Sequence, residues 1–277
     1  MLETLRNAFK IKELRKRIGF TFLMLIVVRI GSQLPIPGVS PDVFKELFHS
    51  GGDAMNFLDA ITGGSFERMS IFALNITPYI TSSIIMQLLT IAFPKLEEIQ
   101  RDGEQGRKLM TKITRYVTVG LALVESLAMA IGFGRSGQLT EFNALYVIEI
   151  VTALTAGSAV LMWIGERITE KGIGNGISIV LVINIISRIP SDLTSLYEQF
   201  VKDKTVAKGT LAAVIILAII IAVVILVIFL QGAERKIPVQ YSKKIQGRKQ
   251  VGGSATVIPM KVNTAGVIPV IFAQSLL

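Results

Sequence analysis

The chain has 277 residues, 51% of them hydrophobic, and a mean hydropathy of +0.58. Several apolar runs reach the roughly 20 residues that a tilted helix needs to cross a bilayer, which argues against a single soluble core and predicts a multi-span, all-α membrane protein. The absence of Cys excludes disulfides and thiolate sites, and the single His49 leaves little for His-based catalysis. A formal charge of +9 would suggest nucleic acid binding in a soluble chain, but in a membrane protein its placement along the loops matters more.

The chain begins with a charged amphipathic segment, residues 1–17, which has neither the short apolar region nor the small-residue cleavage site of a signal peptide. We expect this segment to lie on the membrane surface. The apolar runs that follow predict the spans 18–36, 71–93, 115–133, 146–165, 177–190 and 210–231, and a seventh that begins near Thr264.

Lys and Arg gather in three stretches: the first segment, the loop after the second span and the loop after the sixth. The loops 37–70 and 134–145 are poor in basic residues and carry Asp and Glu instead. Under the positive-inside rule, the three basic stretches and the N-terminus are cytoplasmic and the two acidic loops lie on the outer side. An even number of crossings separates the basic stretches, so the assignment is consistent, and the mixed 191–209 loop decides nothing.

The second predicted span, 71–93, is long and apolar enough to cross a bilayer and yet unusually polar. Its polar and helix-breaking residues are Asn75, Thr77, Pro78, Thr81, Ser82, Ser83 and Gln87. We expect Pro78 to bend the helix, while Ile76, Ile80 and Ile84 recur four apart and predict an apolar stripe. Polarity at membrane depth is tolerated where it is buried in protein or lines a wet cavity. Either this helix combines a wet face with an apolar constriction, or its Ser and Thr are ordinary packing residues bonded to their own backbone.

Residues 51–70 place a short helix-like piece, Ala54 to Thr62, between the glycine pairs Gly51-Gly52 and Gly63-Gly64. The piece is too short to span a membrane, and glycine pairs are natural hinges because they accept backbone angles that other residues resist. It is either a small movable element that folds back toward the membrane or an ordinary external loop helix.

Three glycines, Gly172, Gly174 and Gly176, follow the fourth span with neither the preceding strand nor the spacing of a phosphate-binding loop. The stretch predicts a tight cytoplasmic turn between two closely approaching helices, of which the second is short and contains Asn184. Charged residues before the turn are expected to pair on the helix surface: Glu166, Arg167, Glu170 and Lys171. The prominent charge inside a predicted span is Arg29, which can snorkel or cap a loop.

Several long motifs occur in a fixed order: RIGSQLPIPGV, SIFALNITPYITSSIIMQLL, GERITEKGIGNGIS, QGRK and KVNTAGVIPVIFAQS. In this order they closely resemble the SecY family, the central subunit of the bacterial protein-conducting channel. The resemblance runs from the first span to the last residue and covers the N-terminal six and a half spans of a ten-span family. It implies two half bundles related by a pseudo-two-fold axis in the membrane plane, around an hourglass pore with a lateral opening between the second and seventh spans.

The resemblance also divides the chain. It implies a cytoplasmic amphipathic segment at 1–17 and an N-terminal half bundle at 18–190. Residues 191–277 begin the second half, with the sixth span, a basic cytoplasmic loop at 233–262 and the start of the seventh span.

The resemblance implies roles for four groups of residues in this sequence. An apolar pore ring, which seals by dewetting and fits loosely around a polypeptide, matches Ile76, Ile80, Leu181 and Ile271. Leu181 stands where the family usually has Ile, which keeps the ring apolar. A plug that moves aside for a translocating chain matches residues 51–70, with Met55, Phe57, Leu58, Ile61, Gly63 and Gly64. The lateral gate matches Thr81, Ser82, Gln87 and Gln274. Contacts to cytosolic partners match Arg107, Lys108, Lys243, Lys244, Arg248 and Lys249.

The implied partners are SecE-like and SecG-like small membrane subunits, a SecA-like motor ATPase, the ribosome, signal sequences and nascent polypeptides, and membrane lipid. The implied location is the bacterial plasma membrane, with no enzymatic activity and no cofactor. From the residues alone, a secondary transporter with inverted repeats and broken helices is an equal alternative, and it would require a convergent charged or ion-binding cluster. An intramembrane enzyme fits worse, because HExxH, GxSxG and Cys are absent and His49 lies outside the spans.

Overall fold

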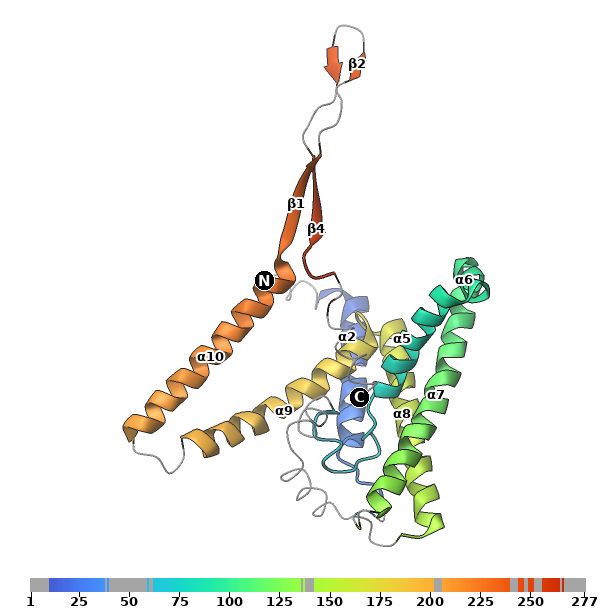
Figure 1. Ribbon diagram of the computed structural model, residues 1–277, viewed down its shortest axis with the longest axis vertical. Coiled ribbons are helices and arrows are strands. Elements are labelled where there is room, and N and C mark those ends of the chain that lie inside the picture. The colour runs from blue at the N-terminus through green and yellow to red at the C-terminus, as the bar shows by residue number, and fades with distance from the viewer. Residues whose placement is uncertain are drawn as a thin grey trace. The chain divides into compact units, whose positions relative to one another are not determined.

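The computed structural model describes residues 10–37, 39, 59, 62–135, 137, 142–201, 206–239, 244–246, 249–251, 256–264 and 266 (Figure 1). The chain divides into two compact units, Met1–Asp192 and Leu193–Leu277. The first unit contains α2 (Lys12–Gly31), α5 (Thr77–Ala92), α6 (Pro94–Arg101), α7 (Gly103–Arg135), α8 (Ala144–Lys171) and the start of α9 (Gly176–Phe200). The second contains α10 (Val206–Gly232) and the strands β1 (Glu234–Val239), β2 (Lys244–Gln246), β3 (Lys249–Val251) and β4 (Thr256–Lys261).

Four of the described helices are long and apolar enough to cross a membrane, namely α7, α8, α9 and residues Lys208–Gly232 of α10. A fifth candidate is the pair of α5 and α6, which is bent by 106°. α7, α8, α9 and α10 contain the four spans predicted from 115 to 231, whereas the span predicted at 71–93 matches α5 only from Thr77 onward. The predicted first span, 18–36, coincides with α2 only as far as Gly31, and the charges of the first turns keep α2 outside the set. Of the predicted seventh span, only Thr264 and Gly266 are among the described residues.

The bend in the second span lies at Pro94, and the prediction that Pro78 bends it was wrong. Helix α5 begins at Thr77, so Pro78 occupies the first turn, where a missing N–H costs nothing. Phe93, directly before Pro94, is extended with φ −115° and ψ 111°. A proline disfavours the helical conformation of the residue before it, which ends α5 and starts α6 in a new direction.

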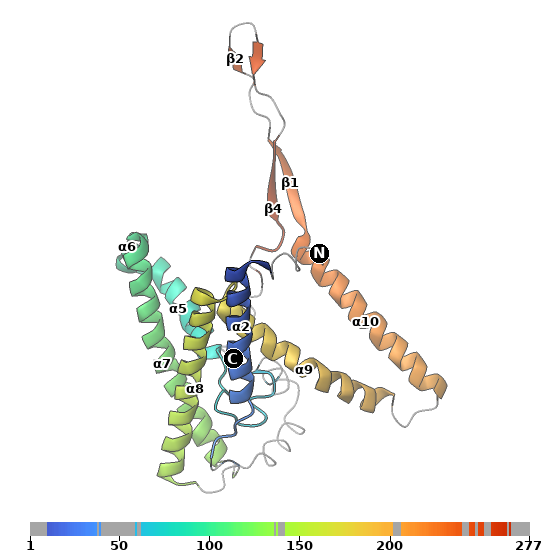
Figure 2. The same ribbon diagram turned by 180° about the vertical axis from the view of Figure 1, so that it is seen from behind.

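The interior of the first unit consists of two apolar clusters that meet on residues 69–76. One cluster includes Met69, Ala73 and Leu74 with side chains of α7 and α8. The other joins residues of α2, α8 and α9 to the same segment: Val28, Phe72, Ile76, Leu161, Ile164, Ile168 and Val180. Helices α7 and α8 run side by side, and α2 lies against α8 (Figures 1 and 2). The segment before α5 is therefore part of the core of this unit.

Backbone hydrogen bonds fix the same segment to the chain that leaves α2. Ile36 donates its N–H to the carbonyl of Met69 at 3.0 Å, and Ile71 donates to the carbonyl of Leu34 at 3.0 Å. Pro35 and Ser70 form an isolated antiparallel bridge between these two bonds. Buried backbone groups are almost always paired, and here the pairing closes the loop after α2 onto the entrance to α5.

The turn between α8 and α9 is as tight as its glycines predict. Helix α8 ends at Lys171 and α9 begins at Gly176. A Cβ on Gly176 would overlap the carbonyl group of Gly165 and lie 2.7 Å from the Cβ of Ile168, so only glycine permits this approach. The prediction of two closely approaching helices at this turn is confirmed, whereas the prediction that the second is short was wrong, because α9 has 25 residues.

In the second unit, α10 exposes apolar side chains on all its faces: the 18-residue window that qualifies it as a span is 0% buried. A helix that is apolar all round is covered by lipid or protein in its functional setting. After it, β1 pairs antiparallel with β4, with Glu234 opposite Lys261, and β2 pairs with β3. The described parts of the basic loop predicted after the sixth span therefore form two antiparallel strand pairs, β1–β4 and β2–β3, which we call the β-ribbon.

Candidate functional site

The entrance to α5 is fixed by an amide pair with α9. Asn75 has a positive φ of 53°, a conformation that Asn adopts more readily than most residues because its short side chain can bond locally. Its side chain is 1% exposed, and its Oδ1 accepts a hydrogen bond of 3.0 Å from Nδ2 of Asn184, which is 3% exposed. Both residues are polar in a setting that penalises unpaired groups, so the pair ties the start of α5 to the middle of α9.

Gly63 packs directly on the same turn of α9. Its φ is +71°, and a Cβ there would lie 2.7 Å from the carbonyl oxygen and 3.0 Å from the Cα of Asn184. Any other residue would strain the backbone and collide with the helix. Gly63 is therefore a close contact between the 62–70 segment and α9.

Asp59 is buried and accepts hydrogen bonds from residues of this segment. It is 0% exposed. Its Oδ1 accepts a 2.8 Å hydrogen bond from the N–H of Glu67, and its carbonyl accepts bonds of 3.1 Å from Oγ1 of Thr62 and from the N–H of Gly64. Side-chain oxygens of Asp commonly bond nearby backbone groups in this way, and here these bonds hold residues 62–67 around Asp59.

An arginine of α9 neutralises the buried carboxylate. Arg188 forms an ion pair with Asp59, and its Nη1 lies 3.8 Å from Oε2 of Glu67. Its Nε donates to Asp192, one turn further along α9, at 3.2 Å. Arg188 is itself 19% exposed, so this network lies in a partly desolvated setting where charge pairing is strong.

Of the predicted ring residues, Ile76 lies inside the core: it is 1% exposed and belongs to the cluster with Phe72 and Val180. Ile80 packs against that cluster and is partly exposed, and Leu181 on α9 is also partly exposed. Ile271 lies outside the described residues. The pore ring remains a prediction, and the partly exposed pair Ile80 and Leu181 is its more accessible portion.

The predicted gate residues of α5 do not share one face. Ser82 is 0% exposed, and its hydroxyl lies 2.6 Å from that of Thr118 on α7, so helix packing explains its polarity. Thr81 is 9% exposed, whereas Gln87 is exposed to solvent or lipid. Thr90 donates to the carbonyl of Met86 within its own helix at 2.7 Å. Ordinary packing thus accounts for part of the polarity of α5.

Half of the predicted plug lies outside the described residues, including Met55, Phe57, Leu58 and Ile61. Its described end has many fixed contacts: Met69 and Ser70 are 0% exposed, and Gly63 rests on α9 while Gly64 bonds Asp59. A movable element at 51–70, as the sequence suggested, therefore does not include residues 69 and 70, which are part of the core.

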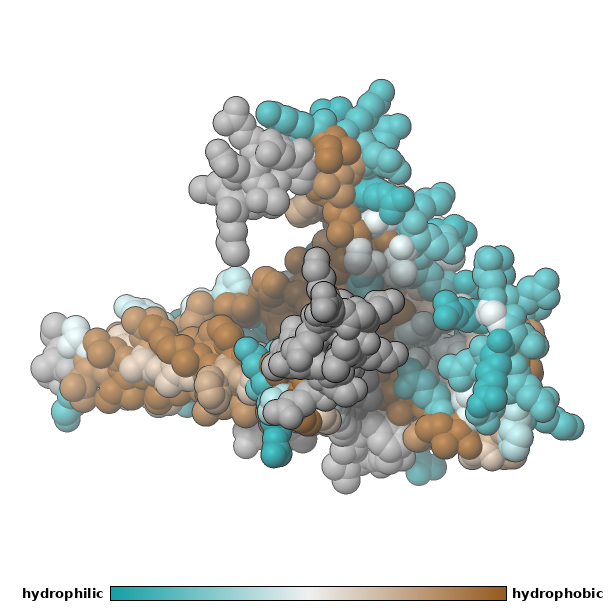
Figure 3. Space-filling model, turned by 90° about the horizontal axis from the view of Figure 1, so that it is seen from above, coloured by the Kyte–Doolittle hydropathy of each residue, from teal (hydrophilic) through white to brown (hydrophobic). Residues whose placement is uncertain are grey.

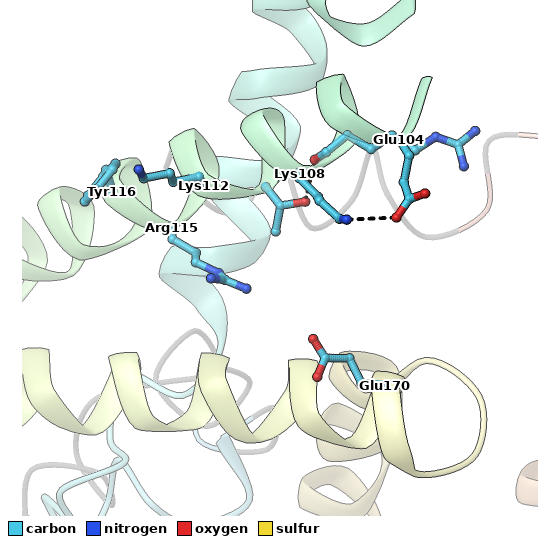
Figure 4. Close-up of a pocket in the computed structure, with 8 residues that line it drawn as sticks. Glu104, Lys108, Lys112, Arg115, Tyr116 and Glu170 are labelled. Atoms are coloured by element: carbon cyan, nitrogen blue, oxygen red, sulfur yellow. Dashed lines mark hydrogen bonds and ion pairs between the residues drawn. The ribbon is translucent and has the colours of Figure 1, made fainter. Parts of the chain in front are cut away.

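The predicted cytosolic contacts on α7 line a polar cavity of about 560 Å³ (Figure 4). Lys108 pairs with Glu104 at 2.8 Å, and the side chains of Arg115 and Glu170 point toward each other across the cavity from α7 and α8. The cavity is lined by Glu104, Arg107, Lys108, Thr111, Lys112, Arg115, Tyr116 and Glu170. Figure 3 shows hydrophilic residues gathered over α6 and the first turns of α7.

On the β-ribbon, Lys244 lies opposite Val251 and Lys249 opposite Gln246, near the tip. Lys243 and Arg248 lie outside the described residues.

The charges before the α8–α9 turn pair in two ways. Arg167 and Glu170 form the expected surface pair at 2.8 Å. Glu166 instead binds Arg115 of α7, with 2.8 Å between Oε2 and Nη2, so it joins two helices. The prediction of surface pairing was therefore incomplete.

Sequence reasoning missed the roles of Arg188 and Asp59. Arg29 was singled out as the prominent charge within a span, although Arg188 also lies within the predicted span 177–190, one turn after Asn184. That spacing places both on one face of a helix and was the available signal. Arg29 lies in a mostly apolar groove with Phe22, Leu25 and Ile26.

Comparisons with known proteins agree on one family. The model of the SecY family matches residues 70–277. Protein translocase subunit SecY of Halalkalibacterium halodurans is 44% identical over 285 residues, covering 100% of this chain and 65% of its own length. The SecY subunit of Thermotoga maritima is 40% identical over 286 residues, with the same coverage of 100% and 65%.

Solved structures share the fold. A protein-conducting channel matches with a TM-score of 0.62 and 21% identity over 95% of this chain and 56% of its own. Sec61 from a canine ribosome-channel complex of the endoplasmic reticulum matches with a TM-score of 0.62, 20% identity and the same coverage of 95% and 56%. The chain spans 65% of the length of the first relatives, and the similarity covers all of this chain. On its sequence and its helical fold, this chain belongs to the SecY family.

Proposed function

We propose that this chain supplies most of the central subunit of a protein-conducting channel, which moves unfolded secretory polypeptides across the plasma membrane and membrane proteins into it. The observation that carries the proposal is that the whole of this chain matches protein translocase subunits at 40–44% identity. The helices long and apolar enough to cross a membrane fit a multi-pass membrane protein. A secondary transporter is not favoured, since these relatives are translocase subunits.

The seal of the proposed channel is an apolar ring at Ile76, Ile80, Leu181 and Ile271. Branched apolar side chains make a narrow pore unfavourable for a continuous water column and bind no particular side chain of the cargo. The partial exposure of Ile80 and Leu181 supports a position at an open face of the half bundle. The plug, 51–70, closes against this ring, with its described end anchored on α9.

The proposed lateral gate borders the exposed side of α5. We assign to it Gln87, which is exposed on α5, together with Gln274 and Thr81. The neighbouring Ser82 contacts Thr118 of α7, so the opposite side of α5 is packed against α7. An entering signal sequence would separate the gate from this side. The apolar exteriors of the spans contact lipid.

Cytosolic partners bind the basic elements on the inner side. The cavity at Arg107 and Lys108 and the β-ribbon with Lys243, Lys244, Arg248 and Lys249 present basic residues that suit acidic protein surfaces and RNA phosphates. We assign to them a SecA-like motor ATPase and the ribosome. SecE-like and SecG-like small subunits would complete the complex in the membrane. The chain acts as a passage and carries out no reaction of its own.

The proposed orientation places the N-terminus, Lys108 and the β-ribbon in the cytoplasm. Because the chain has no Cys, single cysteines report on it without background. In intact cells, an impermeant thiol reagent should modify Gly137→Cys, between α7 and α8, and should reach Lys108→Cys only after the membrane is permeabilised. Labelling of Lys108→Cys from outside intact cells would show that the proposed orientation is wrong.

A complementation experiment tests the function. This chain is joined to the C-terminal remainder of a SecY relative to make a complete channel and expressed in bacteria depleted of their own subunit. We expect growth and export of a secretory protein to be restored. A chimera that is inserted and assembled with its small subunits but exports nothing would refute the proposal.

A further inference from the structure

The geometry points to a charge latch on one face of α9, in which Arg188 holds the loop that contains Asp59 and residues 62–67 against the helix, through its pairs with Asp59 and Glu67. The inference deepens the proposed function, on which it rests, by naming what keeps the plug end in place and what must break to release it. The latch is a conformational device within the first unit and is built from described residues alone.

The latch has two levels on successive turns of one helix. Asn184 and Arg188 are four residues apart, so their side chains lie on the same face of α9. At the first level, Gly63 rests against the backbone of Asn184, whose side chain binds Asn75 at 3.0 Å. At the second level, Arg188 pairs with Asp59. The loop is thus held by shape at one turn and by charge at the next.

The charge level is strong because Asp59 has been removed from water. A carboxylate that is 0% exposed is stable as an anion only when it is paired and hydrogen-bonded. Asp59 receives the N–H of Glu67 on one oxygen and faces Arg188 with the other. Loss of Arg188 leaves the carboxylate buried without its cation, and the loop regains solvation for Asp59 only by leaving α9.

The carboxylate of Asp192 makes the latch reversible. It lies on α9 itself, 3.2 Å from Nε of Arg188, so the cation keeps this partner when the loop departs with Asp59 and Glu67. The open state therefore does not strand a bare charge on α9. Asn75, directly before Ile76 and α5, joins the same helix face, so a displacement of the start of α5 acts on the turn that supports Gly63.

The latch is tested in the complete channel by measuring how often the loop opens. Ser65 is 1% exposed, and Ser65→Cys preserves its shape, so its rate of thiol labelling reports opening without requiring transport. We expect Arg188→Gln to raise this rate by about tenfold or more, because it leaves the buried carboxylate of Asp59 without its cation. Asp59→Asn should also raise the rate, but by less, because Arg188 keeps Asp192 as a partner. The matched control Arg167→Gln, which removes an exposed pair with Glu170, should leave the rate unchanged.

The double variant Asp59→Asn with Arg188→Gln separates a pair from two independent effects. Once both charges are gone, no charge is stranded, so its labelling rate should stay well below the product of the two single increases. Rates that multiply, or an unchanged rate in Arg188→Gln, would overturn the latch. If Arg188→Gln does not assemble, the near-isosteric Asp59→Asn decides the question by the same readout.

Ion leak through the same variants separates the latch from the proposed function. If labelling and leak rise together, the loop closed by the latch is part of the seal. If labelling rises and leak does not, the latch stands and the assignment of the segment as a plug fails.

Discussion

Deletion of residues 51–58 from the complete channel should raise resting ion leak while the complex still assembles, whereas deletion of 62–70 should abolish assembly. The first deletion removes part of the proposed plug. The second removes Met69 and Ser70, both 0% exposed, and the bridge to Pro35. Loss of one large buried side chain costs about 2–5 kcal/mol, a large fraction of the stability of a typical domain.

The two deletions are compared by the yield of the purified complex and by ion conductance in planar bilayers. A variant of equal length, in which residues 51–58 are replaced by a Gly/Ser linker, controls for chain connectivity. Failure of the 51–58 deletion to assemble would show that this stretch is a structural brace. Normal assembly after deletion of 62–70 would contradict the role of this segment in the core.

Most of the helices follow from the sequence because hydropathy and length are local properties. The spans at 115–133, 146–165 and 210–231 lie inside α7, α8 and α10 because each run is apolar over about the length that a bilayer requires. Boundaries were less predictable. The run 71–93 reads as one span, but residues 71–76 are turns held by bonds to the chain after α2.

Contacts between segments that are distant along the chain could not be predicted from the sequence. The polarity of Ser82 suits a gate and a helix interface equally well, and only the position of Thr118 on α7 decides between them. From the sequence, Asp59 is one acidic residue of a predicted external loop, because no neighbouring residue predicts that its carboxylate is buried. Its ion pair with Arg188 depends on how the loop folds back onto α9, which a single sequence does not encode in any local pattern.

The proposed ring predicts different outcomes for two isoleucines that are one helical turn apart. Ile76→Ser should lower the yield of folded complex, because the side chain is 1% exposed within a packed cluster and its truncation costs about 2–5 kcal/mol. Ile80→Ser should leave the fold largely intact, because Ile80 lies at the edge of that cluster. It should raise resting ion conductance and admit substrates with weak signal sequences, since a polar side chain wets the constriction.

The control for this comparison is Leu88→Ser on the same helix, at a site that is 50% exposed. Single-channel conductance and export of a substrate with a defective signal sequence are measured for Ile80→Ser, Leu181→Ser and their combination. We expect export of normal substrates to persist in all three, because a collar that touches its cargo loosely has no specific contact to lose. Equal conductance in the combined variant and in Leu88→Ser would remove the basis for placing Ile80 and Leu181 at the seal. The pore would then have to be lined by other residues. A higher conductance in the double variant than in either single variant would instead indicate that both side chains face the same column of water.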